Sequence, residues 1–238
     1  GSSTQADSGT NLFASVRSSN FLASGNGNTT KFTTSTGGTY YGVTGLQKVV
    51  LRSKPVITVS APQGVLTNSL TEIIRITVGA NTNPIALKGF GVNLTTMGVS
   101  VVPTSTSVIV SRTTDPGTNL TGSVYGNPIT PNATSGDLYV AFANPETIIP
   151  GALKTYIVKV TPSGASSTPG TARITTQLDR NETRHIDGVP AYAYQFYSPL
   201  SWIWSDLSDD QTGIESNLQW ANAYLIRPFP LDAVTVTN

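Results

Sequence analysis

The sequence predicts an all-β protein built around a β-sandwich, and three observations carry this prediction. The 15 Pro and 22 Gly residues are spread along 238 residues without a regular period, so they interrupt the chain too often for long helices. The apolar runs between them are short and rich in β-branched residues. These runs recur roughly every 10 to 15 residues with Gly or Pro turns between them, a spacing typical of sandwiches.

The pattern within the runs indicates how the strands face. In residues 72–78, the apolar Ile74, Ile76 and Val78 alternate with polar residues and so share one face. A Pro-Gly turn within residues 144–152 is expected to separate two strands. The strands together predict an immunoglobulin-like β-sandwich over residues 47–188. The expected strands are 48–53, 55–61, 72–78, 85–94, 107–111, 136–142, 154–160 and 172–178.

Residues 1–46 form an extended polar arm, rich in Ser, Thr, Gly and Asn. Ordering such a segment costs about 1–2 kcal/mol per residue, so its apolar side chains need a partner. Residues 11–23 are long enough for one donor strand, which could complete the sheet edge of a neighbouring subunit. The alternative is an arm that folds back on its own sheet. The expected assembly residues are Leu12, Phe13, Val16, Phe21 and Leu22.

Composition excludes several classes of function. Only 11% of the residues are charged and the net charge is +1, so no basic field exists to attract nucleic acid. The absence of Cys excludes thiol chemistry, and the single His185, in a charged stretch, predicts a salt-bridged loop. No stretch approaches the roughly 20 apolar residues of a membrane helix. We therefore expect no enzyme activity, no cofactor, no nucleic acid partner and no direct membrane insertion.

The same composition points to an extracellular, cell-surface protein. Surface polarity comes from Ser, Thr, Asn, Gln and Gly instead of Lys and Glu, and no disulfide is possible. A bacterial, archaeal or viral source is the expected one. The chain starts Gly1-Ser2-Ser3 without Met, which fits either a processed terminus or an expression scar.

The C-terminal segment, residues 189–238, is enriched in aromatic residues and is expected to pack on or extend the sandwich. Residues 201–205 alternate as a strand does, and residues 213–222 are expected to form a short helix or a loop. Core packing is the commoner use of such rings, and a sugar-stacking platform is the alternative. The candidate aromatic binding surface is Trp202, Trp204, Trp220 and Tyr224.

Two further patterns allow modification or ion binding. Asp206, Asp209 and Asp210 could offer oxygen ligands to Ca²⁺, although their spacing does not match the EF-hand loop and a solvated acidic turn is the alternative. Asn-x-Thr sequences in a secreted chain can accept glycans, although Asn and Thr are abundant enough for chance matches. The candidate glycosylation sites are Asn28, Asn93, Asn119, Asn132 and Asn181.

Three stretches carry a resemblance to known proteins. They are residues 51–59, which enter the sandwich, residues 148–156 inside it, and the Trp-Ser-Asp of residues 204–206 followed by Trp-x-Asn-x-Tyr-Leu at residues 220–225. Over about residues 48–230 the chain resembles extracellular β-sandwich surface and filament-like proteins of candidate-phyla, ultra-small bacteria. The resemblance implies location and assembly, and it implies no catalytic residues.

Three functions are therefore expected, in order. The first is a structural subunit of an extracellular filament, pilus or surface coat, whose partners are other copies of itself joined by strand addition. The second is a monomeric adhesin or glycan-binding module that uses the C-terminal aromatic residues to contact glycans or proteins of a host or neighbouring cell. The third is a viral structural protein.

Overall fold

The computed structural model describes residues 52–178, 202–207 and 232–238 with their side chains, and elsewhere the backbone of short strands within residues 11–49, 186–187 and 220–222. The chain divides into two units, residues 1–51 and residues 52–238. The sandwich was expected to begin at residue 47, five residues before this division. Each unit is described by itself below.

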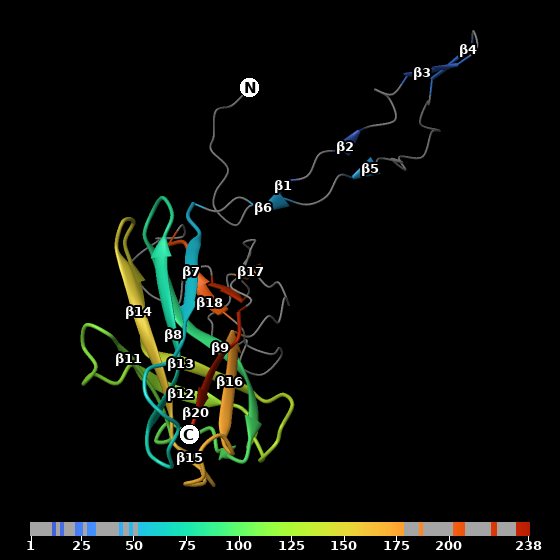
Figure 1. The fold of residues 1–238 in the computed structure, drawn as a ribbon. Helices are drawn as coiled ribbons and strands as arrows, with labels where there is room; N and C mark the ends of the chain where they lie inside the picture. The colour runs from blue at the N-terminus through green and yellow to red at the C-terminus, as the bar shows by residue number, and fades with distance from the viewer. Residues whose placement is uncertain are drawn as a thin grey trace. The chain divides into compact units, whose positions relative to one another are not determined.

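Unit 2 consists of strands, and the described residues contain no helix (Figure 1). The prediction of an all-β sandwich is confirmed. The strands are β7 Pro55–Ser60, β8 Thr71–Ala80, β9 Ile85–Met97, β10 Ser100–Val101, β11 Val108–Arg112, β12 Thr121–Tyr125, β13 Asp137–Ile148, β14 Leu153–Val160, β15 Pro162–Ser163, β16 Arg173–Leu178, β17 Ile186–Asp187, β18 Trp202–Ser205, β19 Trp220–Asn222 and β20 Val234–Thr237.

The smaller sheet has four antiparallel strands in the order β11-β14-β8-β7. Its inward side chains follow the period of two that the sequence predicted, so Ile74, Ile76 and Val78 are fully buried. The outward side chains include a ladder of threonines, where Thr77 and Thr155 share a hydrogen bond of 2.8 Å. Apolar residues inside and hydroxyls outside make this a half-buried sheet.

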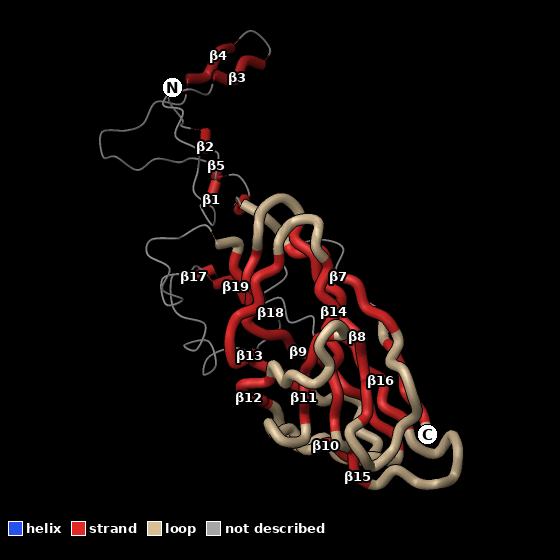
Figure 2. The backbone as a smooth tube through the Cα atoms, turned by 90° about the vertical axis from the view of Figure 1, so that its left-hand side faces the viewer, coloured by secondary structure: helices blue, strands red, loops and turns tan. Residues whose placement is uncertain are grey.

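The larger sheet is organised around β9, which has 13 residues and uses both of its edges (Figures 1 and 2). One edge pairs with β13 from Ile85 to Asn93. The other edge pairs first with β18, over residues 86–90, and then with β16, over residues 92–97. β16 continues to β20, and β18 continues to β19 and β17. The C-terminal segment therefore supplies internal strands of this sheet.

An aromatic cluster fills the space between the two sheets. The ring of Trp202 stacks on Phe90, with centroids 5.7 Å apart, and Phe90 meets Phe142 edge-on at 5.6 Å. Phe142 lies 5.4 Å from Tyr156, which belongs to the smaller sheet. The four rings are buried, with exposed fractions between 0% and 3%. They join residues from both sheets into one core.

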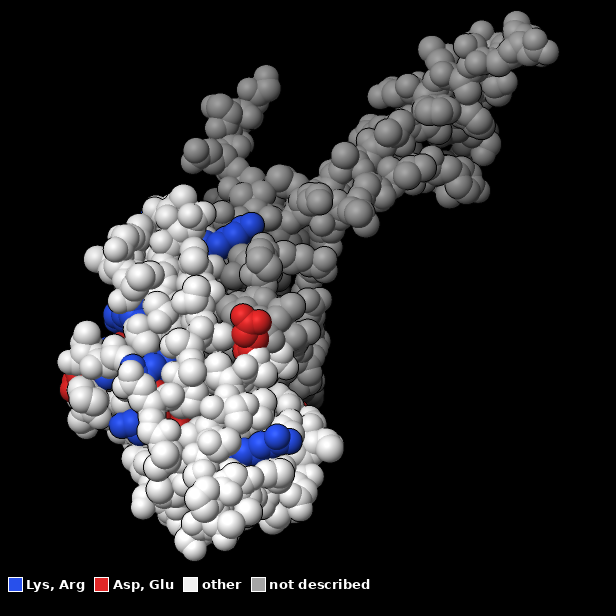
Figure 3. All heavy atoms as spheres, viewed as in Figure 1, with Lys and Arg blue, Asp and Glu red and all other residues white. Residues whose placement is uncertain are grey.

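The surface is short of charge, as the composition predicted. On the face seen in Figure 3, single Lys, Arg, Asp and Glu side chains are separated by wide uncharged areas. Hydroxyl pairs across strands replace ion pairs at several positions, among them Ser100 with Ser163 and Thr175 with Thr235. Solvation of this unit therefore depends largely on hydroxyls and backbone groups.

Several strand boundaries differ from the prediction. β13 was expected to end near residue 142 but continues through Pro145 to Ile148, because a bulge between Ala141 and Glu146 accommodates the proline that cannot donate a ladder hydrogen bond. The predicted Pro-Gly turn is present after it: Ala152 N–H donates to Ile149 O at 3.1 Å, and Gly151 has φ +80°. β12 was not predicted. Of residues 213–222, only β19 is described, and it is a strand.

Gly89 of β9 lies where the larger sheet is most closely packed, between Ala141 of β13 and Ile203 of β18. A Cβ there would come within 3.0 Å of Ala141 Cα and closer still to the Val140 carbonyl and the Tyr139 hydroxyl.

We expect Gly89→Ala to lower the free energy of unfolding by about 1–3 kcal/mol through overpacking, measured by urea denaturation. Gly117→Ala is the matched control, since a Cβ at Gly117 has no neighbour within 4 Å, and its effect should stay below about 0.5 kcal/mol. Equal effects of the two substitutions would contradict the role assigned to Gly89.

Candidate functional site

The arm forms its own set of short strands in unit 1. These are β1 Asn11–Leu12, β2 Ser15–Val16, β3 Leu22–Gly25, β4 Asn28–Lys31, β5 Val43–Thr44 and β6 Lys48–Val49. They pair in nested antiparallel order, β3 with β4, β2 with β5 and β1 with β6. The predicted single strand over residues 11–23 is therefore divided into three short strands, each of which pairs within unit 1. The partner of β1 is β6, which falls in the strand expected over residues 48–53 as part of the sandwich.

The sequence signal for this ribbon was the dipeptide Asn26-Gly27, which separates β3 from β4. Asn-Gly favours the two-residue turn that matches the twist of paired strands. Leu12, Val16 and Leu22 lie in described strands, but their side chains, like Phe13 and Phe21 entirely, lie outside the described residues. Their role as assembly residues stays a prediction.

Trp202 and Trp204 are core residues. Their exposed fractions are 0% and 1%, and all four residues of β18 are buried, so both faces of this strand are covered. Ile203, between them, packs in a second cluster with Ala86, Tyr139 and Ala141. The predicted aromatic binding surface is therefore not formed by these two tryptophans. Only the backbone of Trp220 is described, and Tyr224 lies outside the described residues.

Three of the five Asn-x-Thr sites can be placed with their side chains. Asn93, in β9, donates both to Ser135 Oγ and to Asp137 Oδ1 at 2.7 Å. Asn119 is exposed and its Oδ1 accepts the backbone N–H of Thr121 at 2.9 Å, while the exposed Asn132 accepts that of Gly98 at 3.1 Å. Asn119 and Asn132 are therefore the accessible acceptors. Asn28 is described only as backbone of β4, and Asn181 lies outside the described residues.

Asp206 has a structural partner. It is 5% exposed, and its Oδ2 accepts the backbone N–H of Arg52 at 2.7 Å, which fixes the start of unit 2 against the end of β18. Arg52 also donates from Nη1 to the Leu207 carbonyl at 3.2 Å. Asp209 and Asp210 lie outside the described residues, and no group of three potential metal ligands occurs in the part of unit 2 that the structure describes. Cation binding by these aspartates stays a prediction.

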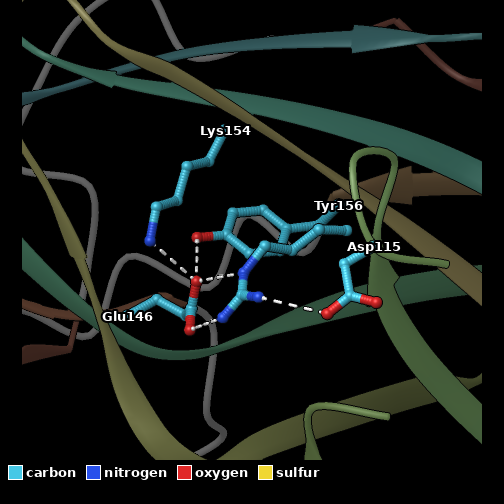
Figure 4. Close-up of polar contacts among 5 residues, drawn as sticks. Asp115, Glu146, Lys154 and Tyr156 are labelled. Carbon is cyan, nitrogen blue, oxygen red and sulfur yellow. Dashed lines mark hydrogen bonds and ion pairs between the residues drawn. The ribbon is translucent and has the colours of Figure 1, made fainter. Parts of the chain in front are cut away.

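One buried charged cluster, not anticipated from the sequence, joins the two sheets (Figure 4). Glu146, on β13, is 7% exposed and receives both arms of the Arg112 guanidinium, from Nη2 to Oε1 at 2.6 Å and from Nε to Oε2 at 2.8 Å. Lys154 Nζ lies 3.0 Å from Oε2, and the Tyr156 hydroxyl lies 3.5 Å from it. Arg112 also faces Asp115 at 3.9 Å. Arg112 ends β11, and Lys154 and Tyr156 belong to β14, so Glu146 ties the larger sheet to the smaller.

The charges in this cluster hold each other in their ionised forms. Burial by itself raises the pKa of Glu146, but hydrogen bonds from Arg112 and Lys154 and their positive charges lower it overall. The hydrogen bond to Glu146 raises the pKa of Arg112, and burial raises the pKa of Tyr156. The carboxylate is therefore an ionised acceptor with its oxygens engaged.

Glu146 with Arg112 and Lys154 forms a structural ion cluster that holds the two sheets together, called the Glu146 clamp below. A general base needs a lone pair directed at substrate, whereas both oxygens of Glu146 accept hydrogen bonds from cationic groups of the protein. A hollow of about 310 Å³ lies at residues 126–130, 133 and 135–137, and its ionisable side chain, Asp137, accepts a hydrogen bond from Asn93. His185 lies outside the described residues.

No local sequence pattern indicated the clamp, because Glu146 is 34 residues from Arg112 and 8 residues from Lys154. The signal that could have found Glu146 is that it is the single charged residue between Leu138 and Leu153, since carboxylates in apolar stretches are rarely buried unless paired.

Comparison with known proteins adds little. No protein-family model matches the chain, and no curated protein matches it. Among solved structures, it is similar to the T6 backbone pilin of serotype M6 Streptococcus pyogenes, described as a modular three-domain structure with variable loops and extensions, with 11% identity and a TM-score of 0.19. The match covers 90% of this chain and 40% of the pilin. The resemblance to candidate-phyla surface proteins stays a prediction. No helix in the described residues is long and apolar enough to cross a membrane.

Replacing Glu146 by Gln should destabilise unit 2, because it removes the negative charge that Arg112 and Lys154 share. Breaking a buried ion pair costs about 3–5 kcal/mol. We expect a loss at the low end of this range, since the side chains of Arg112 and Lys154 are 28% and 31% exposed and water can solvate their charges after the substitution. Urea denaturation measures the change. Asp115→Asn is the control: Asp115 is 49% exposed and 3.9 Å from Arg112, so its loss should change stability by no more than about 1 kcal/mol.

The clamp should also make stability depend on pH. Because the folded protein holds the pKa of Glu146 below its ordinary value of 4.5, the unfolded chain takes up the proton more readily. The ionised Glu146 carboxylate therefore contributes to the free energy of unfolding above about pH 4.5. This contribution is lost as the pH falls through the pKa of Glu146 in the folded protein. We expect the stability difference between the wild type and Glu146→Gln to shrink below pH 4.5 in denaturation series. A difference that stays constant down to pH 2 would contradict this.

Proposed function

We propose that this chain is a structural subunit of an extracellular filament, pilus or surface coat, and that subunits assemble by β-strand addition through the arm. The observation that carries the proposal is the pairing of the arm. Its described strands pair only with one another, over two to four residues at a time. Residues 1–51 form a unit separate from the sandwich.

Such a ribbon is poorly suited to stand alone. An isolated two-stranded hairpin is at best marginally stable in water, and pairs as short as those of β1 and β2 offset little of the ordering cost. A two-stranded ribbon also presents two outer edges with backbone N–H and C=O groups that can pair further. A third strand from a neighbouring subunit adds stability to the ribbon and pairs with the backbone groups at one of its edges.

The sandwich has properties suited to a subunit of a fibre. Its core is continuous across both sheets, and the Glu146 clamp joins them without a disulfide or a metal ion in the described residues. In this proposal the chain acts outside the cell, its partners are other copies of itself, and it needs no cofactor or catalytic residue. The alternative of a glycan-binding adhesin loses support, since Trp202 and Trp204 are buried.

The test compares assembly of the full chain with a chain lacking residues 1–46. We expect the full chain to form filaments in negative-stain micrographs and large particles by light scattering, and the shortened chain to remain monomeric, because the strand that joins subunits is gone. Circular dichroism checks that the shortened chain keeps its β-sheet content. Monomers in both samples would overturn the proposal and favour the adhesin.

A further inference from the structure

The smaller sheet ends in an open edge. β7 pairs with β8 along one side, and no backbone hydrogen bond from another described residue reaches its other side. At the opposite edge of the smaller sheet, Leu120 N–H donates to Val110 O of β11, so a backbone group reaches that edge. In the described part of unit 2, β7 is therefore the open edge strand of the smaller sheet.

The alternation of hydrogen-bonded and non-bonded pairs between β7 and β8 shows which backbone N–H and C=O groups of β7 point to its open side. Asn81 N–H donates to Lys54 O at 3.0 Å, and residues 54 and 81 are partners in the antiparallel register that continues to Ser60. Bonded and non-bonded pairs alternate in such a ladder, so Val56, Thr58 and Ser60 bond to β8. The N–H groups of Ile57 and Val59 therefore point to the open side, with the C=O groups of Pro55, Ile57 and Val59.

β7 has only one of the devices that usually block an edge, a proline at its first residue, Pro55. Its sequence, Pro-Val-Ile-Thr-Val-Ser, has no charged residue, and its register with β8 has no bulge. Beside it lies an apolar strip: Val56 is 52% exposed and Leu153 is 72% exposed, and both pair with Gly79. A Cβ at Gly79 would come within 2.9 Å of Leu153 Cδ2, so this leucine leans over the glycine. Exposed apolar side chains beside an open edge mark a site for a partner strand.

We propose that the outward edge of β7 accepts residues 11–16 from the arm of a second copy of this chain. This inference rests on the proposed function and names its acceptor. Residues 11–16, Asn-Leu-Phe-Ala-Ser-Val, match the six residues of β7 in length, or about 20 Å of strand. They carry no charge, so no repulsion opposes the pairing, and in an extended donor strand Leu12, Ala14 and Val16 would share one face. The same residues hold β1 and β2, whose pairs within the arm are only two residues long.

Donor and acceptor lie on the same chain but are different surfaces. Each copy therefore offers an arm to one neighbour and β7 to another, a head-to-tail contact that produces an open chain of subunits unless the rotation closes a ring.

Cysteine cross-linking of the full chain tests this pairing, and the natural chain contributes no background because it has no Cys. One preparation carries Val56→Cys, and a second, of different mass, carries a single Cys scanned from residue 11 to residue 16. Val56 bonds to β8, so it stands opposite a donor residue in a non-bonded pair, with Cα atoms about 4.5 Å apart in an antiparallel arrangement, within disulfide range. We expect mixed disulfides at one or two arm positions after mild oxidation. Val102→Cys is the matched control, since Val102 is 51% exposed, and it should give none.

A second variant tests the hydrogen bonds directly. Val59→Pro removes an outward N–H without touching the ladder to β8, and proline is tolerated on an edge strand. We expect about fivefold weaker assembly, the change that corresponds to one hydrogen bond of about 1 kcal/mol. Val59→Ala, which keeps the N–H, should assemble like the wild type.

The outcomes separate this inference from the function on which it rests. Filaments without Val56 cross-links would overturn β7 as the acceptor and leave the filament proposal standing. Disulfides between two Val56→Cys copies would instead show a closed pair of β7 strands and overturn the arm as occupant. Cross-links confined to one chain, in a doubly substituted protein, would show that the arm folds back on its own edge. An absence of filaments in the wild type would overturn the proposed function itself.

Discussion

The larger sheet depends on β9, because this strand is the only one that pairs with three others along its length among the described strands. Its two edges are divided between β13 on one side and β18 and β16 on the other. Gly89 permits the close approach of β13, and Phe90, next to it, enters the aromatic core. A single strand therefore sets the position of β18, which is more than 100 residues away from it in the sequence.

Low charge content shapes the rest of the molecule. Hydroxyl pairs across strands take the place of surface ion pairs, while the strongest ionic cluster lies between the sheets, where Arg112 and Lys154 neutralise Glu146. A buried carboxylate with two cationic partners tolerates desolvation that a lone carboxylate would not. The clamp therefore fixes how the two sheets meet at a place where Pro145 and a bulge interrupt regular pairing.

The features that relate to assembly have a common physical basis, which is unsatisfied backbone pairing. The ribbon of unit 1 and the β7 edge each present peptide groups without a further strand, and the two segments proposed to pair, residues 11–16 and β7, carry no charged side chain. Most soluble proteins block such edges, so an uncharged edge beside exposed Val56 and Leu153 is more consistent with a contact surface than with a solvent-facing one. Strand addition joins the two through groups that every residue except proline possesses, which explains why no specific side-chain motif was visible in the sequence.

The sequence by itself determined the local structure. Alternating residues such as Ile74, Ile76 and Val78 specified buried faces, and Pro150-Gly151 specified a turn, because strand period and turn geometry depend on neighbouring residues alone. Only the tertiary structure decided what the strands pair with. Trp202 and Trp204 alternate in the sequence as an exposed platform would, yet both are buried because both faces of β18 are covered. The same holds for Glu146, whose partners come from two other strands, and for β7, which is an edge only because no later segment pairs beside it in the described chain. Pairing between distant strands depends on which surfaces meet, and that information is not contained in any local stretch of sequence.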